Sequence, residues 1–120
     1  MSEAYRHQGK ILEVKVSPEA AQPYFARALE VDPENPWAVV SYAQNTYQLN
    51  RDLSATLREF RRALCLLPGD QWLPVDIVMF LVSQDLPVAA REFCVVVPPS
   101  SLEDPRFADV CQDAKGEPIW

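Results

Sequence analysis

The sequence is poor in the residues that most often carry enzyme chemistry. Its 120 residues include one histidine, His7, and three glycines. A catalytic triad built on histidine would have to use His7, which lies near a chain end that is expected to fray. A phosphate-binding loop needs several closely spaced glycines, whereas Gly9, Gly69 and Gly116 stand far apart. We therefore expect no enzyme activity and no cofactor.

Cysteine is also scarce and irregularly placed. Cys65, Cys94 and Cys111 are odd in number and widely separated, and no Cys-x-x-Cys pair occurs. A structural zinc site needs about four cysteine or histidine ligands at close spacing. A disulfide framework more often has an even number of cysteines. We therefore expect no metal site, and we interpret the cysteines as small buried thiols in a reducing cytoplasm.

Long hydrophobic runs are missing as well. The longest apolar run is the segment 77–82, which Ser83 ends. A membrane-spanning helix needs about 20 apolar residues, and the first ten residues lack the apolar core of a signal peptide. These observations predict a soluble, cytoplasmic protein that does not contact a membrane.

The charge is acidic and unevenly distributed. Basic residues number 11 and acidic residues 17, which gives a net charge of −6, and the excess of acid falls in residues 71–120. A nucleic-acid binder normally presents a basic face to the phosphates. Arg58, Arg61 and Arg62 form a local basic cluster, but such short clusters are more often solvated helix faces. We expect no nucleic-acid partner, and the 48% of apolar residues predicts a folded domain.

What the chain does contain is an internal repeat. Residues 25–37 read FARALEVDPENPW and residues 60–72 read FRRALCLLPGDQW. A shift of 35 residues aligns six identities in thirteen positions: Phe25/Phe60, Arg27/Arg62, Ala28/Ala63, Leu29/Leu64, Pro33/Pro68 and Trp37/Trp72. Self-similarity at this period is typical of helical repeat proteins.

The repeated positions indicate helix pairs. Apolar residues recur at helical spacing, Pro33 and Pro68 end the helices, and Asn35 and Asp70 are capping-type residues ahead of the next segment. We predict helices near residues 2–14, 18–31, 37–49, 53–67, 72–83, 87–96 and 103–113. Residues 94–97 (CVVV) could instead form a β-strand, but a lone strand would have no pairing partner.

This pattern resembles the tetratricopeptide repeat family, whose motif is W-x2-L-G-x2-Y, then A-x3-F-x2-A, then P, in about 34 residues. Gly9 and Ala21 match the small-residue positions of the first unit, followed by Phe25 and Ala28. The second unit fits with Thr56 in place of the small alanine, and the third is degraded. The resemblance covers about residues 2–101.

The resemblance implies an all-α, right-handed α-solenoid. Its domain would span residues 1–114, with repeats at about 2–35, 36–70 and 71–101 and a capping helix at 102–114. Residues 115–120 would form a tail. Arrays of this kind need a capping helix because the last repeat otherwise exposes its apolar face.

The resemblance also implies where a partner binds, because in this family the first helix of each repeat lines a concave groove. The residues at those positions are Arg6 and Lys10 in the first repeat, Trp37, Val40, Gln44, Tyr47 and Gln48 in the second, and Trp72, Val75, Asp76 and Met79 in the third. Tryptophan and tyrosine are enriched in interface cores. The alternative for Trp37 and Trp72 is that they only pack between adjacent repeats.

The expected function is therefore a protein–protein interaction module. It would bind a peptide or helical segment of a protein partner in the groove, as an adaptor or in a chaperone-like role. The alternative is a self-associating structural module that forms a homo-oligomer, or a fragment of a longer repeat scaffold. Asp76 in the third repeat also predicts that acidic C-terminal tails are not bound, since like charges repel.

Overall fold

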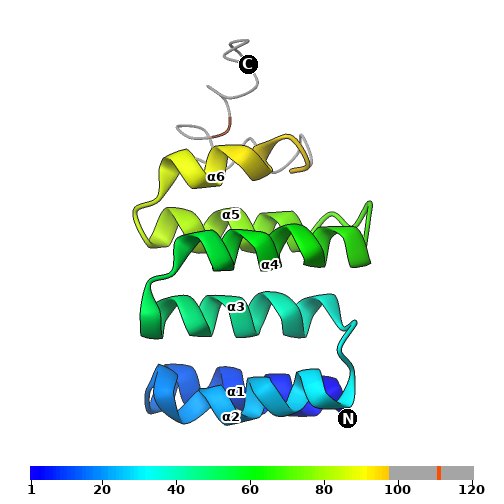
Figure 1. Ribbon diagram of the computed structural model, residues 1–120, viewed down its shortest axis with the longest axis vertical. Coiled ribbons are helices and arrows are strands. Elements are labelled where there is room, and N and C mark those ends of the chain that lie inside the picture. The colour runs from blue at the N-terminus through cyan, green and yellow to red at the C-terminus, as the bar shows by residue number, and fades with distance from the viewer. Residues whose placement is uncertain (98–110, 112–120) are drawn as a thin grey trace. The chain divides into compact units, whose positions relative to one another are not determined.

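The computed structural model describes residues 1–97 and residue 111 (Figure 1). In this part of the chain all the regular structure is helical, and no strand occurs. Within residues 1–97 six helices follow one another: α1 (Ser2–Lys15), α2 (Pro18–Val31), α3 (Pro36–Asn50), α4 (Leu53–Leu66), α5 (Leu73–Ser83) and α6 (Pro87–Cys94). These helices confirm the all-α prediction and the first six predicted helices, with ends that differ by at most two residues.

The helices pack mainly with their neighbours in sequence. The chain divides into two compact units, residues 1–68 and 69–120. In the first unit α1 packs on α2, α2 on α3, and α3 on α4, with a smaller contact between α1 and α3. In the second unit α5 packs on α6.

Short-range signals fix the starts of the helices. Ser17 Oγ accepts a hydrogen bond from the amide of Ala20 (3.1 Å) and so caps α2. The Asp52 carboxylate accepts one from the amide of Ala55 (3.1 Å) and caps α4. Arg51 adopts the left-handed conformation (φ 59°), which allows the tight turn between α3 and α4.

The repeated residues occupy equivalent places in the core. Phe25 and Ala28 of α2 are fully buried, and so are Phe60 and Ala63 of α4, which the 35-residue shift aligns with them. Pro33 and Pro68 both follow the helix that carries these residues. The sequence repeat is therefore also a repeat of buried positions.

Gly9 allows α1 and α2 to pack closely. A Cβ atom added to it would lie 2.8 Å from Cε1 and 2.9 Å from Cδ1 of Phe25. Because the Phe25 ring is fully buried, it has little room to swing away. The missing side chain at Gly9 thus leaves room for the Phe25 ring where the two helices pack together.

Replacing Gly9 with alanine should therefore destabilise the first unit. Alanine gains about 1 kcal/mol over glycine in helix propensity, but overpacking a core costs about 1 to 3 kcal/mol. We expect the free energy of unfolding, measured by urea titration, to fall by about 1 kcal/mol. Adding Phe25→Leu should recover part of this loss, because the two side chains are coupled. A Gly9→Ala variant more stable than the parent would contradict the close packing.

The cysteines correct one expectation. Cys94 and Cys111 form a disulfide, and Cys65 is a free, exposed thiol on α4. The interpretation of three buried thiols was therefore wrong, because an odd total does not prevent two of the three from pairing. Disulfides persist mainly in oxidising compartments, so cysteine usage no longer supports a reducing one.

The remaining expectations concern the C-terminal part of the chain. Residues 94–97 end α6 and continue as turns and a bend, so the alternative β-strand is not formed. Apart from Cys111, the predicted capping helix (102–114) lies outside the described residues, as does the predicted tail (115–120). In the described part of the chain, no helix is both long and apolar enough to cross a membrane.

Candidate functional site

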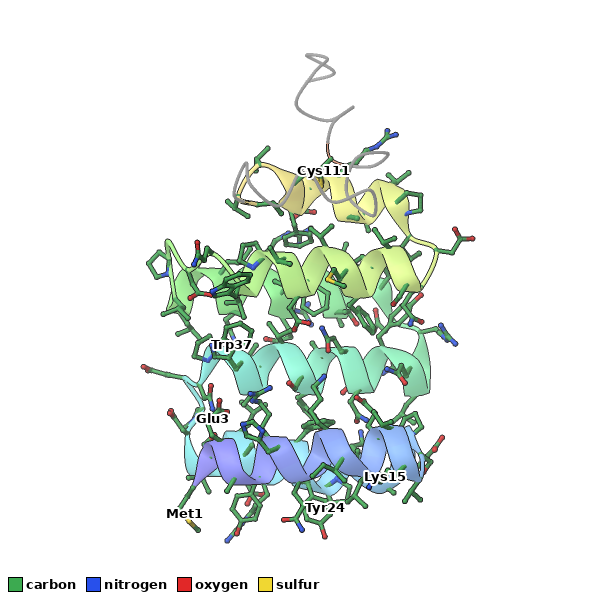
Figure 2. The ribbon with its side chains drawn as sticks, turned by 180° about the vertical axis from the view of Figure 1, so that it is seen from behind. Met1, Glu3, Lys15, Tyr24, Trp37 and Cys111 are labelled. Atoms are coloured by element: carbon green, nitrogen blue, oxygen red, sulfur yellow. A yellow bond between two sulfur atoms is a disulfide. The ribbon has the colours of Figure 1, made fainter. Side chains whose placement is uncertain are left out.

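A row of charged and amide side chains joins α1 to α3 in the first unit (Figure 2). We call it the polar row; its α1 members are Glu3, Arg6, Lys10 and Glu13, which recur at helical spacing along one face. It includes Arg6 and Lys10, which the sequence placed at the start of the predicted groove.

Arg6 is largely occupied by its neighbours. Its Nε lies 2.7 Å and its Nη2 3.2 Å from the two carboxylate oxygens of Glu3. Its Nη1 lies 3.5 Å from Ser41 Oγ of α3, and the guanidinium lies 6.0 Å from the ring centroid of Trp37. The hydrogen bond from Arg6 is the largest cause that lowers the pKa of Glu3 below its usual value. Arg6 therefore holds α1 to α3 more than it offers charge to a ligand.

Lys10 and Glu13 continue the row toward the other end of α1. Lys10 Nζ donates to Gln44 Oε1 (3.1 Å) and lies 3.8 Å from Glu13 Oε1. Glu13 Oε2 accepts a hydrogen bond from Asn45 Nδ2 (3.1 Å), which also donates to the Pro18 carbonyl (2.8 Å). The Lys10 side chain remains 36% exposed, so it is the more accessible of the two predicted cations.

Asn35 completes the row where α2 ends and α3 begins. Its Oδ1 accepts the amide of Trp37 (3.1 Å) and caps α3, while its Nδ2 donates to Ser2 Oγ (2.9 Å) and to Glu3 (3.1 Å). Ser2 Oγ in turn donates to the Ala28 carbonyl (2.8 Å). The sequence identified Asn35 as a cap but did not indicate its bonds to the start of α1.

The predicted groove residues of α3 divide by burial. Val40, Gln44 and Tyr47 are buried, with 0%, 4% and 7% of their surface exposed. Trp37 and Gln48 are partly exposed. Trp37 and Gln48 therefore present more surface to a partner than the other three, and a binding role for the whole set stays a prediction.

In the second unit the predicted residues lie at the start and along α5. Trp72 precedes the helix and is 61% exposed, while Asp70 accepts the amide of Leu73 (2.8 Å) and so begins it. Val75, Asp76 and Met79 are partly exposed. Trp72 is thus a surface residue and not a core residue, and its role in binding stays a prediction.

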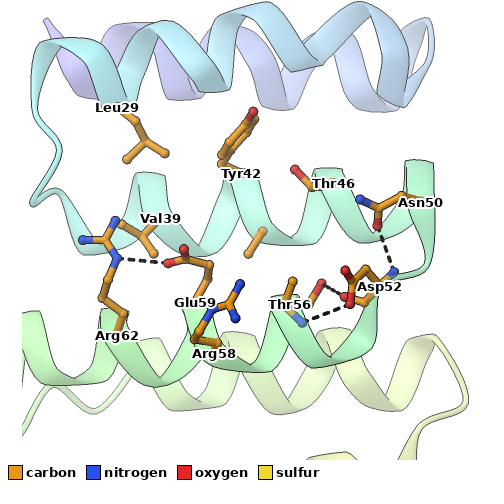
Figure 3. A pocket seen from close by; sticks show the side chains of 12 residues that line it. Leu29, Val39, Tyr42, Thr46, Asn50, Asp52, Thr56, Arg58, Glu59 and Arg62 are labelled. Carbon is orange, nitrogen blue, oxygen red and sulfur yellow. Dashed lines mark hydrogen bonds and ion pairs between the residues drawn. The ribbon is translucent and has the colours of Figure 1, made fainter.

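A pocket that the sequence did not indicate lies in the first unit, between α2, α3 and α4 (Figure 3). Its volume is about 270 Å³. Lining residues are Leu29 of α2, Val39, Tyr42, Ala43, Thr46 and Asn50 of α3, Asp52 before α4, and Ala55, Thr56, Arg58, Glu59 and Arg62 of α4. The sequence did not indicate this pocket because its shape depends on the angles between three helices, which the pattern of residues along the chain does not give.

Among the described residues, no three histidine, cysteine or acidic side chains come close enough to hold a metal ion. Comparison with known proteins gave no further assignment, since no family model matches the chain and no curated protein matches it. The polar row and the pocket are therefore interpreted from their own chemistry.

Proposed function

We propose that this chain is a tetratricopeptide-like repeat module that binds a segment of another protein and catalyses no reaction. The observation that carries the proposal is the contact of Gly9 with Phe25. The family motif requires a small residue in the first helix of a unit and an aromatic residue in the second. Gly9, Ala21, Phe25 and Ala28 stand at the motif positions, and the last three are fully buried.

The architecture that we propose is a right-handed solenoid of about three helix–turn–helix repeats. Two features support it: the helix pairs α1/α2 and α3/α4 bury matching residues, and successive pairs are joined by a proline-containing turn. The degraded third repeat would comprise α5 and α6. A solenoid exposes its first helices along one surface, which suits an extended or helical ligand.

The proposed ligand contacts the accessible edge of the polar row. Lys10, Trp37 and Gln48 are partly exposed members of the predicted set in the first unit, and Arg6 of the same set is only 16% exposed. Accessible aromatic, amide and ammonium side chains on α1 and α3 suit a segment with apolar side chains and exposed backbone carbonyls. Because Arg6 is already paired with Glu3, we expect no tight binding of acidic C-terminal tails. An adaptor or chaperone-like role fits this ligand.

Site-specific photo-crosslinking tests the proposal. A photoreactive amino acid at position 7, which is exposed on α1 next to Arg6, should capture a defined polypeptide from native lysate. The same residue at position 54, which is exposed on α4, serves as the matched control and should not capture it. Trp37→Ala should weaken capture at position 7 by about tenfold, as truncating an interface aromatic residue does. Equal capture at both positions would contradict groove binding.

Self-association is the second candidate function, and a separate observation favours it. Ile11, Val14 and Val16 are 55%, 85% and 66% exposed near the end of α1. Clusters of exposed large apolar residues often mark contacts between proteins. If the chain self-associates, a photoreactive amino acid at position 11 should capture a second copy of the chain, and the sedimentation coefficient should rise with protein concentration. A concentration-independent monomer would exclude this function.

A further inference from the structure

The pocket between α2, α3 and α4 has a size and lining that suit a small organic ligand. Its walls carry Leu29, Val39, Ala43 and Ala55 and the ring of Tyr42. Small-molecule pockets usually measure roughly 300 to 1,000 Å³ and are lined mainly by apolar and aromatic side chains. At about 270 Å³, this pocket suits a single aromatic ring on a short chain and is too small for a larger ligand.

Of the charged residues that line the pocket, all but Arg58 have a partner among the described residues. Asp52 caps α4, and Glu59 is paired with Arg62 at 3.0 Å. Arg62 also points its terminal nitrogens at the Pro33 carbonyl, at 3.5 Å. Arg58, which is exposed like Arg61 but lines the pocket, makes no ion pair or hydrogen bond with any described residue, and Figure 3 shows its side chain directed from α4 toward α3. An unpaired guanidinium at an apolar pocket can bind a carboxylate through two parallel hydrogen bonds.

A buried hydroxyl in the same pocket also lacks a partner. Thr46 Oγ1 is buried and has no hydrogen bond within the described part of the chain. Buried polar groups are nearly always hydrogen-bonded in folded proteins, so an exception calls for an explanation. Because Thr46 lines the pocket, a polar atom of a bound ligand could supply the missing hydrogen bond.

We propose that this pocket binds a small carboxylate with an apolar body, typically an aromatic ring on a short chain. The ring lies against Leu29, Val39 and Ala43, and the carboxylate is held by Arg58. Tyr42 and Thr46 lie beside the ring and supply hydroxyl groups. This site is separate from the polar row and does not depend on the proposed binding of a protein segment.

Titration of the ¹⁵N-labelled full chain with phenylpropionate tests the proposal by NMR. Amide signals of residues 39–46 and 55–59 should shift in a saturable way. Phenylpropanamide, which has the same ring but no charge, should bind about tenfold more weakly, because a charge-assisted hydrogen bond is lost. Arg58→Gln should weaken the binding of phenylpropionate by the same factor, about tenfold. Arg61→Gln removes an exposed arginine of the same helix that does not line the pocket, and should leave binding unchanged.

A second variant fills the pocket instead of removing its charge. Ala55 lines the pocket and is only partly buried, so Ala55→Leu should abolish binding while the circular dichroism spectrum stays helical. The proposal is overturned if the shifts fall elsewhere, if the acid and the amide bind equally, or if Arg58→Gln and Arg61→Gln have the same affinity. These comparisons hold even if Ala55→Leu fails to fold.

Discussion

Replacing Phe25 with alanine should lower the free energy of unfolding by about 3 to 5 kcal/mol, the cost of emptying a fully buried aromatic site. Phe25 is 0% exposed and contacts the Gly9 backbone closely enough that no Cβ fits between them. Domains of this size are stable by only about 5 to 15 kcal/mol, so the variant should lose a large part of its stability at 25 °C. Urea denaturation followed by circular dichroism measures the change.

The equivalent variant in the second repeat sharpens this test. Phe60 is also 0% exposed, and the 35-residue shift aligns it with Phe25, so Phe60→Ala should cost a similar amount. Val14→Ala is the control, because Val14 is 85% exposed and surface substitutions usually change stability by less than about 0.5 kcal/mol. A Phe60→Ala variant as stable as the Val14→Ala control would show that the sequence repeat is not a repeat of core positions.

The second large effect concerns the disulfide between Cys94 and Cys111. The two residues are 17 apart in sequence, and closing a loop of that length stabilises a fold by about 3 kcal/mol. Reduction, or the pair of substitutions Cys94→Ala and Cys111→Ala, should lower the stability of the second unit by about that amount. Thermal unfolding with and without a reductant measures the difference.

Thiol counting provides the control for the disulfide. The chain contains three cysteines, of which Cys65 is the exposed free thiol. Protein purified without reductant should therefore react with one equivalent of a thiol reagent, and with three after unfolding and reduction. Cys65→Ser should leave the reductant-dependent difference in stability unchanged. Three reactive thiols in the unreduced, unfolded protein would show that the bond does not form.

Local features were the most predictable part of the fold. Asn35 and Asp70 were assigned as helix starts because a capping side chain bonds to amides two or three residues ahead. Phe25 and Phe60 were assigned to the core because helical periodicity is visible in the sequence. Both kinds of signal depend on residues within about one or two helical turns.

Long-range features could not be predicted in the same way. Ser2 bonds to Asn35 across 33 residues, and nothing local to either residue indicates the other. The pairing of Cys94 with Cys111 and the pocket beside Arg58 depend on how separate segments meet in space. The buried state of Val40 and Tyr47, at predicted groove positions, likewise depends on what packs against α3 and not on the periodicity of the helix itself.

The exposed thiol of Cys65 gives the protein a labelling site that needs no engineering. Because Cys94 and Cys111 are bonded to each other, a maleimide dye added under non-reducing conditions attaches to α4 alone. The dye can then report rotational correlation times as partners are added, on the helix that also carries Arg58. A single fluorescent preparation of the unmodified sequence would thus serve both binding hypotheses.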